Sequence, residues 1–284
     1  MKNIISFYSL HIFIALFALG NSLHIEAQSI VVDSAKVVIG YNYSCNTKSA
    51  DGQPTIEEYD IALLVGKSIV AQQGLCELVL DEDNDDEYIK ILTESQHNIP
   101  KIYIGFPSDN RITIQESILM NDFEMSEKRI DIQWNIWQDT LELHGYKCKK
   151  ATTTFYGRKW TAWFSEDIPI PYGPWLLGGL PGLILRAESD NIHSFELISL
   201  SNTKYPIKYE RKINTIKTSR DKYVKYRDKI TNNPLYLTNP LSLVAKDIQQ
   251  HKDIYQFGNG VDFIEINGHI FNPHPNVFIP LELK

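Results

Sequence analysis

The sequence predicts a mainly β protein: a curved antiparallel sheet, half-barrel or barrel-like, with a few helices, two of them near the C-terminus. Three observations support this fold class. Segments rich in Val, Ile, Thr and Tyr recur up to Leu200, with turn residues between them. Convincing helical spacing of apolar residues follows only after that point. The strands are long and alternate irregularly, which favours a curved sheet over a flat sandwich.

The predicted strands alternate with short turn signals. Gly157 joins two of them, because a tight reversal requires a residue that accepts a positive φ. Pro107-Ser108-Asp109-Asn110 marks another turn. The predicted strands cover residues 29–45, 58–65, 67–72, 99–106, 111–119, 129–137, 146–155, 159–164, 183–188 and 193–200.

Two helices are predicted near the end of the chain. The first begins at Thr218, which forms a capping-box pattern with Asp221, and its apolar face carries Tyr223, Tyr226 and Ile230. The second begins at Asn239-Pro240, an N-cap followed by proline at the first helical position. Its buried stripe consists of Leu241, Val244, Ala245 and Ile248. A weaker helical pattern covers residues 85–94.

The N-terminal 27 residues have the pattern of a secretory signal peptide. Lys2 precedes an apolar stretch at residues 4–19, and a small residue, Ala27, suits cleavage before Gln28. The first cysteine is Cys45, too far along for a lipoprotein anchor. We therefore expect an exported protein, periplasmic or extracellular, with no transmembrane segment after removal of the signal. Residues 28–284 are predicted to form a single domain.

Charge and cysteine content exclude some classes of partner. The formal net charge of −7 argues against nucleic acid, which requires clustered Lys and Arg, and gives no attraction to anionic membranes. Three cysteines, Cys45, Cys76 and Cys148, leave at least one unpaired. We expect one disulfide at most, because a chain of this size can fold on its apolar core.

The region from residue 156 to residue 185 is the most distinctive part of the chain. Leu180-Pro181-Gly182-Leu183 predicts a type II turn, with the positive φ at Gly182. Because apolar residues are dense around this turn, we expect it to be tucked against the core. On the preceding strand Trp160 and Trp163 point to opposite faces, which leaves one tryptophan on the second face of the sheet.

This region resembles the signature of the GLPGLI family, exported proteins of Gram-negative bacteria whose function is unestablished. The resemblance is specific over residues 145–188 and includes Gly157-Arg158 and Gly173-Pro174-Trp175. It implies a single GLPGLI-type β-rich domain at 28–284 and does not imply a reaction. The signature residues are Gly179, Leu180, Pro181, Gly182, Leu183 and Ile184.

Export, aromatic density and the lack of a recognisable catalytic motif favour a binding or accessory protein of the cell envelope. We expect its concave sheet to shelter a small or apolar ligand or to meet an envelope protein, without a cofactor or a metal. Neither the acidic residues at 81–85 nor His269 and His274 have the spacing of a metal site. The candidate binding residues are Arg158, Trp160, Trp163, Trp175 and Arg186.

Two alternatives remain open. An exported hydrolase of peptides or glycans could be assembled from dispersed residues such as Glu166, Asp167 and a distant histidine. A scaffold partner of an outer-membrane complex would instead present a broad exposed apolar patch.

Overall fold

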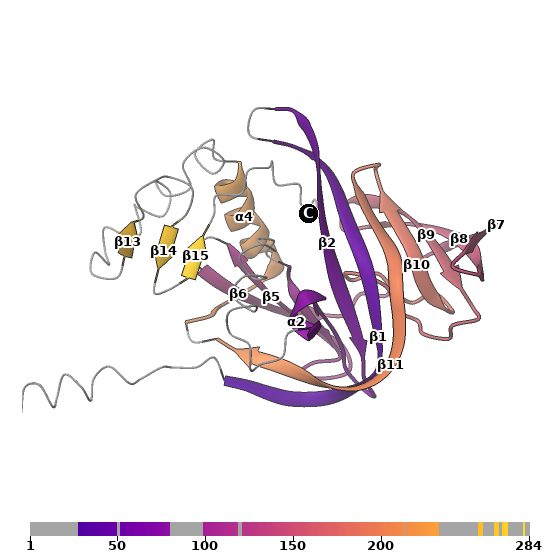
Figure 1. Cartoon of the computed structure of the whole chain (residues 1–284), viewed down its shortest axis with the longest axis horizontal. Helices are drawn as coiled ribbons and strands as arrows, with labels where there is room; N and C mark the ends of the chain where they lie inside the picture. The colour runs from indigo at the N-terminus through magenta and orange to yellow at the C-terminus, as the bar shows by residue number, and fades with distance from the viewer. Residues whose placement is uncertain are drawn as a thin grey trace, which may run out of the picture.

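The computed structural model describes residues 28–49, 52–79, 99–118, 121–212 and 214–232, three short strands within 255–271, and Leu281. It confirms the predicted fold class, because one large antiparallel sheet forms most of it (Figure 1). The strands of this sheet are β1 (Gln28–Lys48), β2 (Pro54–Val65), β3 (Val70–Gly74), β4 (Lys101–Ile104), β5 (Arg111–Ile118), β6 (Asn121–Lys128), β7 (Asn135–Leu143), β8 (Tyr146–Phe155), β9 (Arg158–Ser165), β10 (Leu183–Ser189), β11 (His193–Arg211) and β12 (Ile216–Thr218).

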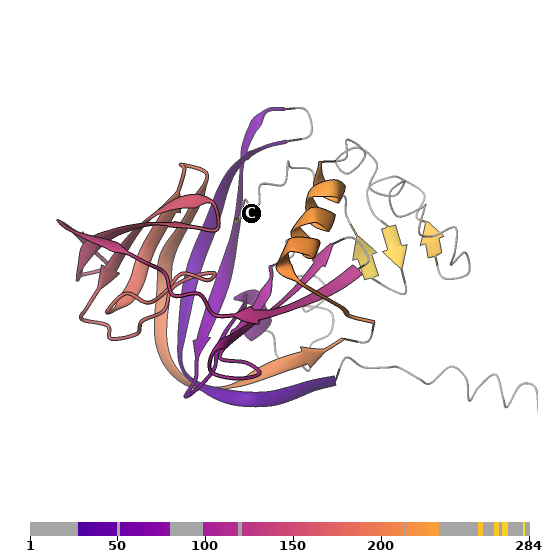
Figure 2. The ribbon, with the colours of Figure 1, turned by 180° about the vertical axis from the view of Figure 1, so that it is seen from behind.

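The 12 strands follow the order β12-β6-β5-β4-β3-β2-β1-β11-β10-β9-β8-β7. All neighbouring pairs are antiparallel except β12 and β6. The sheet is strongly curved, and Figures 1 and 2 show the long strands β1 and β11 bending together. Three register shifts between these two strands account for the bend, since a bulge kinks its strand and increases the local twist.

Two helices are described beside the sheet. The short α2 (Cys76–Val79) follows β3, and α4 (Arg220–Thr231) lies against β6. Helix α4 confirms the predicted helix, and its buried face includes Tyr223. The capping box predicted at Thr218 is wrong, because Thr218 ends β12 and the N-cap is Ser219, which makes no side-chain capping hydrogen bond. A separate small sheet contains β13 (Tyr255–Phe257), β14 (Ile264–Ile266) and β15 (His269–Phe271). The signal sequence and the helices predicted at 85–94 and 239–248 lie outside the described residues.

The main hydrophobic core joins the two ends of the curved sheet. It contains Met125 of β6, Tyr223 of α4 and Trp160 of β9, each of which is only 1% exposed. The connection between β9 and β10 fills the space inside the curve. Trp175 of this connection contacts Trp160 of β9, and its backbone N–H donates to Oε1 of Gln72 in β3 at 2.6 Å. Because β3 and β9 are far apart in the sheet, Trp175 lies within the curve.

The signature segment packs its leucines against the core as predicted, while Gly179 and Pro181 are exposed, and its turn geometry differs from the prediction. Leu180 and Leu183 are buried, whereas the positive φ of +85° belongs to Gly179 and not to Gly182. The prediction of a type II turn with positive φ at Gly182 is therefore wrong. Gly182 is needed for another reason: a Cβ there would lie 2.0 Å from the carbonyl oxygen of Ser165.

Two further predictions concern the strands on either side of the groove described below. The reversal at Gly157 is confirmed, since Tyr156 and Gly157 have φ of 47° and 79°, as a two-residue type I′ hairpin requires. The strand predicted at 129–137 is wrong. Strand β6 ends at Lys128 and β7 begins at Asn135, so residues 129–134 cross between the strands without pairing in the sheet.

Cys45 and Cys148 are buried and Cys76 is half-buried, and no disulfide joins any two of the three. Burial raises the pKa of Cys45 and of Cys148 to about 11. Within the described part of the chain, no helix is both long enough and apolar enough to span a membrane.

Candidate functional site

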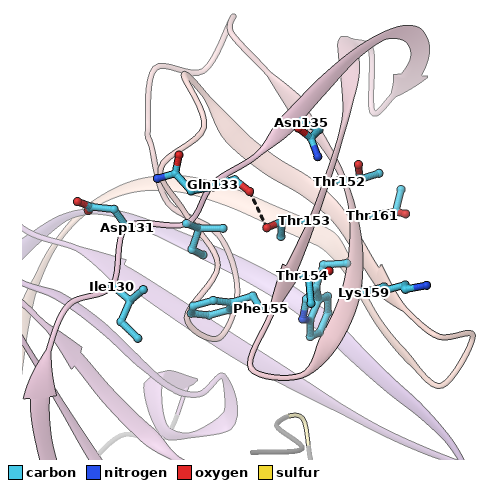
Figure 3. Close-up of a pocket in the computed structure, with 12 residues that line it drawn as sticks. Ile130, Asp131, Gln133, Asn135, Thr152, Thr153, Thr154, Phe155, Lys159 and Thr161 are labelled. Carbon is cyan, nitrogen blue, oxygen red and sulfur yellow. Dashed lines mark hydrogen bonds between the residues drawn. The ribbon is translucent and has the colours of Figure 1, made fainter.

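A groove of about 510 Å³ opens between residues 130–135 and the strands β8 and β9 (Figure 3). Eight of the twelve residues that line it are polar and four are apolar. Its lining consists of Ile130, Asp131, Ile132, Gln133, Asn135, Thr152, Thr153, Thr154, Phe155, Lys159, Trp160 and Thr161.

Alternating residues hold the 130–135 segment in place. Ile132 and Trp134 pack against the main core, while Asp131, Gln133 and Asn135 are exposed. The indole N–H of Trp134 donates to the carbonyl oxygen of Gly178 at 2.9 Å, which ties the segment to the β9–β10 connection. The segment therefore presents three carboxylate or amide side chains to solvent along one wall of the groove.

Strands β8 and β9 bring four threonines to the lining of the groove, distributed over both faces of the sheet. Thr152 of β8 lies directly across from Thr161 of β9, so both hydroxyls occupy the same face of the sheet. Thr153 points the other way and donates from Oγ1 to the carbonyl oxygen of Gln133 at 2.7 Å (Figure 3). This hydrogen bond ties residues 130–135 to β8, on the face of the sheet opposite to Thr152 and Thr161.

Aromatic residues contribute to the lining from the core side. Phe155 is 8% exposed and Trp160 is 1% exposed. Among the described residues, the buried indole N–H of Trp160 has no hydrogen-bond partner. An unpaired buried donor of this kind costs free energy unless water or a ligand satisfies it.

A second hollow, of about 210 Å³, adjoins the same 130–132 segment. Its aromatic wall includes Tyr156 and Tyr172, and the guanidinium of Arg129 lies 5.4 Å from the centroid of the Tyr172 ring. Both hollows share Phe155. Residues 130–132 thus separate a polar groove from a smaller aromatic one.

The sequence-predicted site residues do not converge on one place. Trp160 and Trp175 pack together in the core, with ring centroids 5.6 Å apart. Trp163 and Arg186 form a cross-strand pair in which Trp163 is half-buried, and Arg186 is bound to Glu196 on the neighbouring strand. Of the five candidates, only Trp160 lines the groove.

The arginines and carboxylates singled out from the sequence have ordinary structural partners. Arg158 is 3% exposed and its Nη1 lies 3.3 Å from Oδ2 of Asp190. Glu166 and Asp167 are exposed, and Glu166 is bound to Lys149 at 2.9 Å. In the described ranges, no three His, Cys, Asp or Glu side chains are grouped as a metal ion would require.

Apart from Trp160, the residues of the groove were not identified from the sequence. The run Thr152-Thr153-Thr154 was a usable signal, because alternate threonines on a strand place hydroxyls on one face. The alternation of apolar and polar residues at 130–135 was visible too, but it was interpreted as a paired strand. Because residues 130–134 do not pair with a neighbouring strand, they form one side of the groove instead.

Comparison with known proteins relates the chain to N-glycanases. A family model described as "N-glycanase peptide, N-terminal domain" matches residues 81–232, more than half of the chain. No curated protein matches this chain. Two crystal forms of PNGF-II match at 18% and 16% identity, each with a TM-score of 0.45, over 66% and 68% of this chain. The chain spans about a third of the length of those structures, 32% and 33%.

The family match corrects the resemblance to GLPGLI proteins, which is wrong as a family assignment. Within the six-residue string, Gly182 is required locally, because it lies against the backbone of Ser165. A protein of a different family can have the same local requirement. Every residue that lines the groove lies within the matched segment, whereas strands β1, β2 and β3 lie outside it.

Proposed function

This chain belongs to the family of the N-glycanase peptide, N-terminal domain, and on that premise we propose that it recognises N-linked glycans for a glycan-processing hydrolase. The proposed binding site is the groove between residues 130–135 and strands β8 and β9. The single observation that carries the proposal is the set of polar residues that line this groove, with only one acidic and one basic side chain, inside the segment that the family shares.

Sugars bind through many directed hydrogen bonds to hydroxyl groups, which act both as donors and as acceptors. Thr152, Thr154 and Thr161 offer hydroxyls on one face of β8 and β9, and Gln133 and Asn135 offer side-chain amides. Asp131 is a pure acceptor and Lys159 a pure donor, so both polarities are available. One lysine opposite one carboxylate suits an uncharged ligand better than a phosphate or a nucleic acid, which would require clustered cations.

This proposal differs from the expectation of an apolar ligand on the concave sheet. The inside of the curve is packed by the chain's own side chains, Trp175 and Phe164 among them. The polar groove lies beside β8 and β9 near one end of the sheet, whereas the second hollow is lined by Ile104 and Ile112 of β4 and β5 and by the β9–β10 connection. An exported protein, as the first 27 residues predict, would meet glycoproteins outside the cytoplasm.

Recognition is proposed here in preference to hydrolysis by this sheet itself. Glu166 and Asp167 are exposed, and Glu166 is neutralised by Lys149. General acid–base work requires a carboxyl group whose pKa is shifted by burial or by a charged neighbour within a cleft. The groove contains a single carboxylate, Asp131, on an exposed position.

Isothermal titration with an N-glycopeptide and with the same peptide lacking its glycan tests the proposal. We expect binding of the glycopeptide alone, and weaker binding by the double variant Thr152→Val, Thr161→Val, which keeps side-chain shape and removes two hydroxyls. Lys149→Ala, an exposed change away from the groove, is the control. Equal binding of both peptides, or of neither, would contradict the proposal.

A further inference from the structure

The exposed indole of Trp137 lies beside the polar groove. Trp137 belongs to β7, is 51% exposed, and donates from Nε1 to Oγ1 of Thr152 at 2.9 Å. Thr152 lines the groove, as does Asn135, two residues before Trp137. Figure 3 shows Asn135, Thr152 and Thr161 together at one end of the groove. A large aromatic surface therefore continues the wall of hydroxyls and amides.

A bulge in β7 orients this indole. Ile136 pairs with Ala151 and Thr140 pairs with Lys149, so three residues, beginning with Trp137, oppose the single residue Lys150. Bulges of this kind redirect a side chain and interrupt the ladder of hydrogen bonds. The bond to Thr152 then holds the indole in one orientation although half of its surface is exposed.

The same bulge reduces the suitability of β7 for strand addition. This strand is one edge of the sheet, and a flat edge can pair with a strand of another chain. A bulged edge presents a broken row of backbone donors and acceptors. An exposed aromatic face at this position therefore suits a compact ring better than an extended peptide.

We propose that Trp137 is a stacking platform for one pyranose ring of the glycan, an N-acetylglucosamine-type ring whose substituents are all equatorial. Such a ring has C–H bonds on both faces and hydroxyls around its edge. Its apolar face matches the indole, and its edge hydroxyls can reach Thr152 and Asn135. Because Thr152 accepts from Trp137, its own hydroxyl hydrogen can be donated to the sugar. This inference rests on the proposed function.

The test is calorimetric titration with N,N′-diacetylchitobiose and with a larger N-glycopeptide. We expect Trp137→Ala to weaken binding of both about tenfold, the effect of losing roughly one aromatic stacking contact. Trp137→Phe keeps an aromatic face but loses the N–H, so this variant should lose less binding affinity than Trp137→Ala. Thr152→Val should resemble Trp137→Phe, because each removes the bond that fixes the ring. Val31→Ala, 66% exposed on β1 and outside the groove, should bind like the wild type.

The outcomes separate this inference from the proposed function. Unchanged binding by Trp137→Ala, or wild-type protein that binds the glycopeptide but not chitobiose, overturns the platform and leaves glycan recognition standing. Wild-type protein that binds neither sugar overturns both. Loss in Trp137→Ala of binding to an unglycosylated peptide, with sugar binding intact, overturns the platform in favour of a peptide partner. Circular dichroism of each variant checks that a loss of binding is not caused by unfolding of the variant.

Discussion

The guanidinium of Arg220 lies over the ring of Tyr156, 4.3 Å from the ring centroid. Arg220 begins helix α4 and Tyr156 forms the turn between β8 and β9. Glu127 of β6 completes the contact, because it accepts from Arg220 Nε at 3.0 Å and from the Tyr156 hydroxyl at 2.8 Å. Since Phe155 next to Tyr156 lines both hollows, this cluster supports the binding surface from behind.

Arg220→Ala should destabilise the protein. The side chains of Arg220 and Glu127 are 10% and 24% exposed, so removal of the cation leaves a mostly buried carboxylate and uncovers the Tyr156 ring. We expect a loss of roughly 2–4 kcal/mol in the free energy of unfolding, between the surface and the fully buried case. Denaturant titration measures it. The exposed pair Lys149–Glu166 is the matched control, and Lys149→Ala should cost less than about 1 kcal/mol. Equal losses would contradict this ranking.

The same cluster predicts an acid-sensitive stability. Burial raises the pKa of Glu127. The hydrogen bonds and charge of Arg220, together with the hydrogen bond from the Tyr156 hydroxyl, lower the pKa by more than burial raises it, so the folded-state pKa lies below its ordinary value. A carboxyl with a depressed pKa stabilises the fold above its unfolded pKa, and this contribution disappears as the pH falls through the folded pKa. Glu127→Gln should therefore have a lower Tm than the wild type at pH 7, and this difference in Tm should become smaller near pH 3. A constant gap across this range would contradict the account.

Gly179 and Gly182 separate two reasons for glycine within one short segment. Gly179→Ala meets no atom within 4 Å but must keep a φ of +85°, at a cost of about 1–2 kcal/mol. Gly182→Ala places a Cβ 2.0 Å from the Ser165 carbonyl oxygen, so the backbone of one strand has to move. Gly182→Ala should lower the Tm more than Gly179→Ala, and Gly182→Val still more. The reverse order in thermal melts would mean that positive φ, and not close approach, dominates.

The three thiols should differ in reactivity. Cys45 and Cys148 are buried with a pKa raised by burial to about 11, and Cys76 is half-buried. Because the thiolate is the nucleophile, a disulfide reagent at pH 8 should modify Cys76 first in the native state. The other two should react after denaturation. Cys76→Ser should abolish the fast phase; a fast phase that survives in this variant would show that a buried thiol is accessible.

The fold was predictable where local pattern and tertiary environment agree. Strand β8 was predicted with its observed bounds, Tyr146–Phe155, because it is a continuous run between a hairpin glycine and Gly157. Helix α4 was predicted by its apolar face, whereas the cap expected at Thr218 lies one residue later, at Ser219. The order of the strands was not predicted, since pairing between β1 and β11 joins residues 148 to 183 positions apart.

The site was less predictable than the fold. Tryptophan content drew attention to Trp160 and Trp175, yet both are core residues with 1% and 4% exposure. Trp137 is exposed because a bulge displaces it from the strand ladder, and no residue type announces that bulge in the sequence. The role of Gly182 was assigned to its own φ, whereas a carbonyl 17 residues earlier in the chain determines it.

Hydrogen–deuterium exchange of the wild-type protein, with and without a saturating N-glycopeptide, tests the central claim most directly. A glycan held in the groove should slow exchange in peptides covering residues 130–137 and 150–161, and should leave the rest of the described sheet unchanged. The unglycosylated peptide should protect neither region. Protection confined to other strands, or no protection by a glycopeptide that binds, would contradict the assignment of this groove as the glycan site.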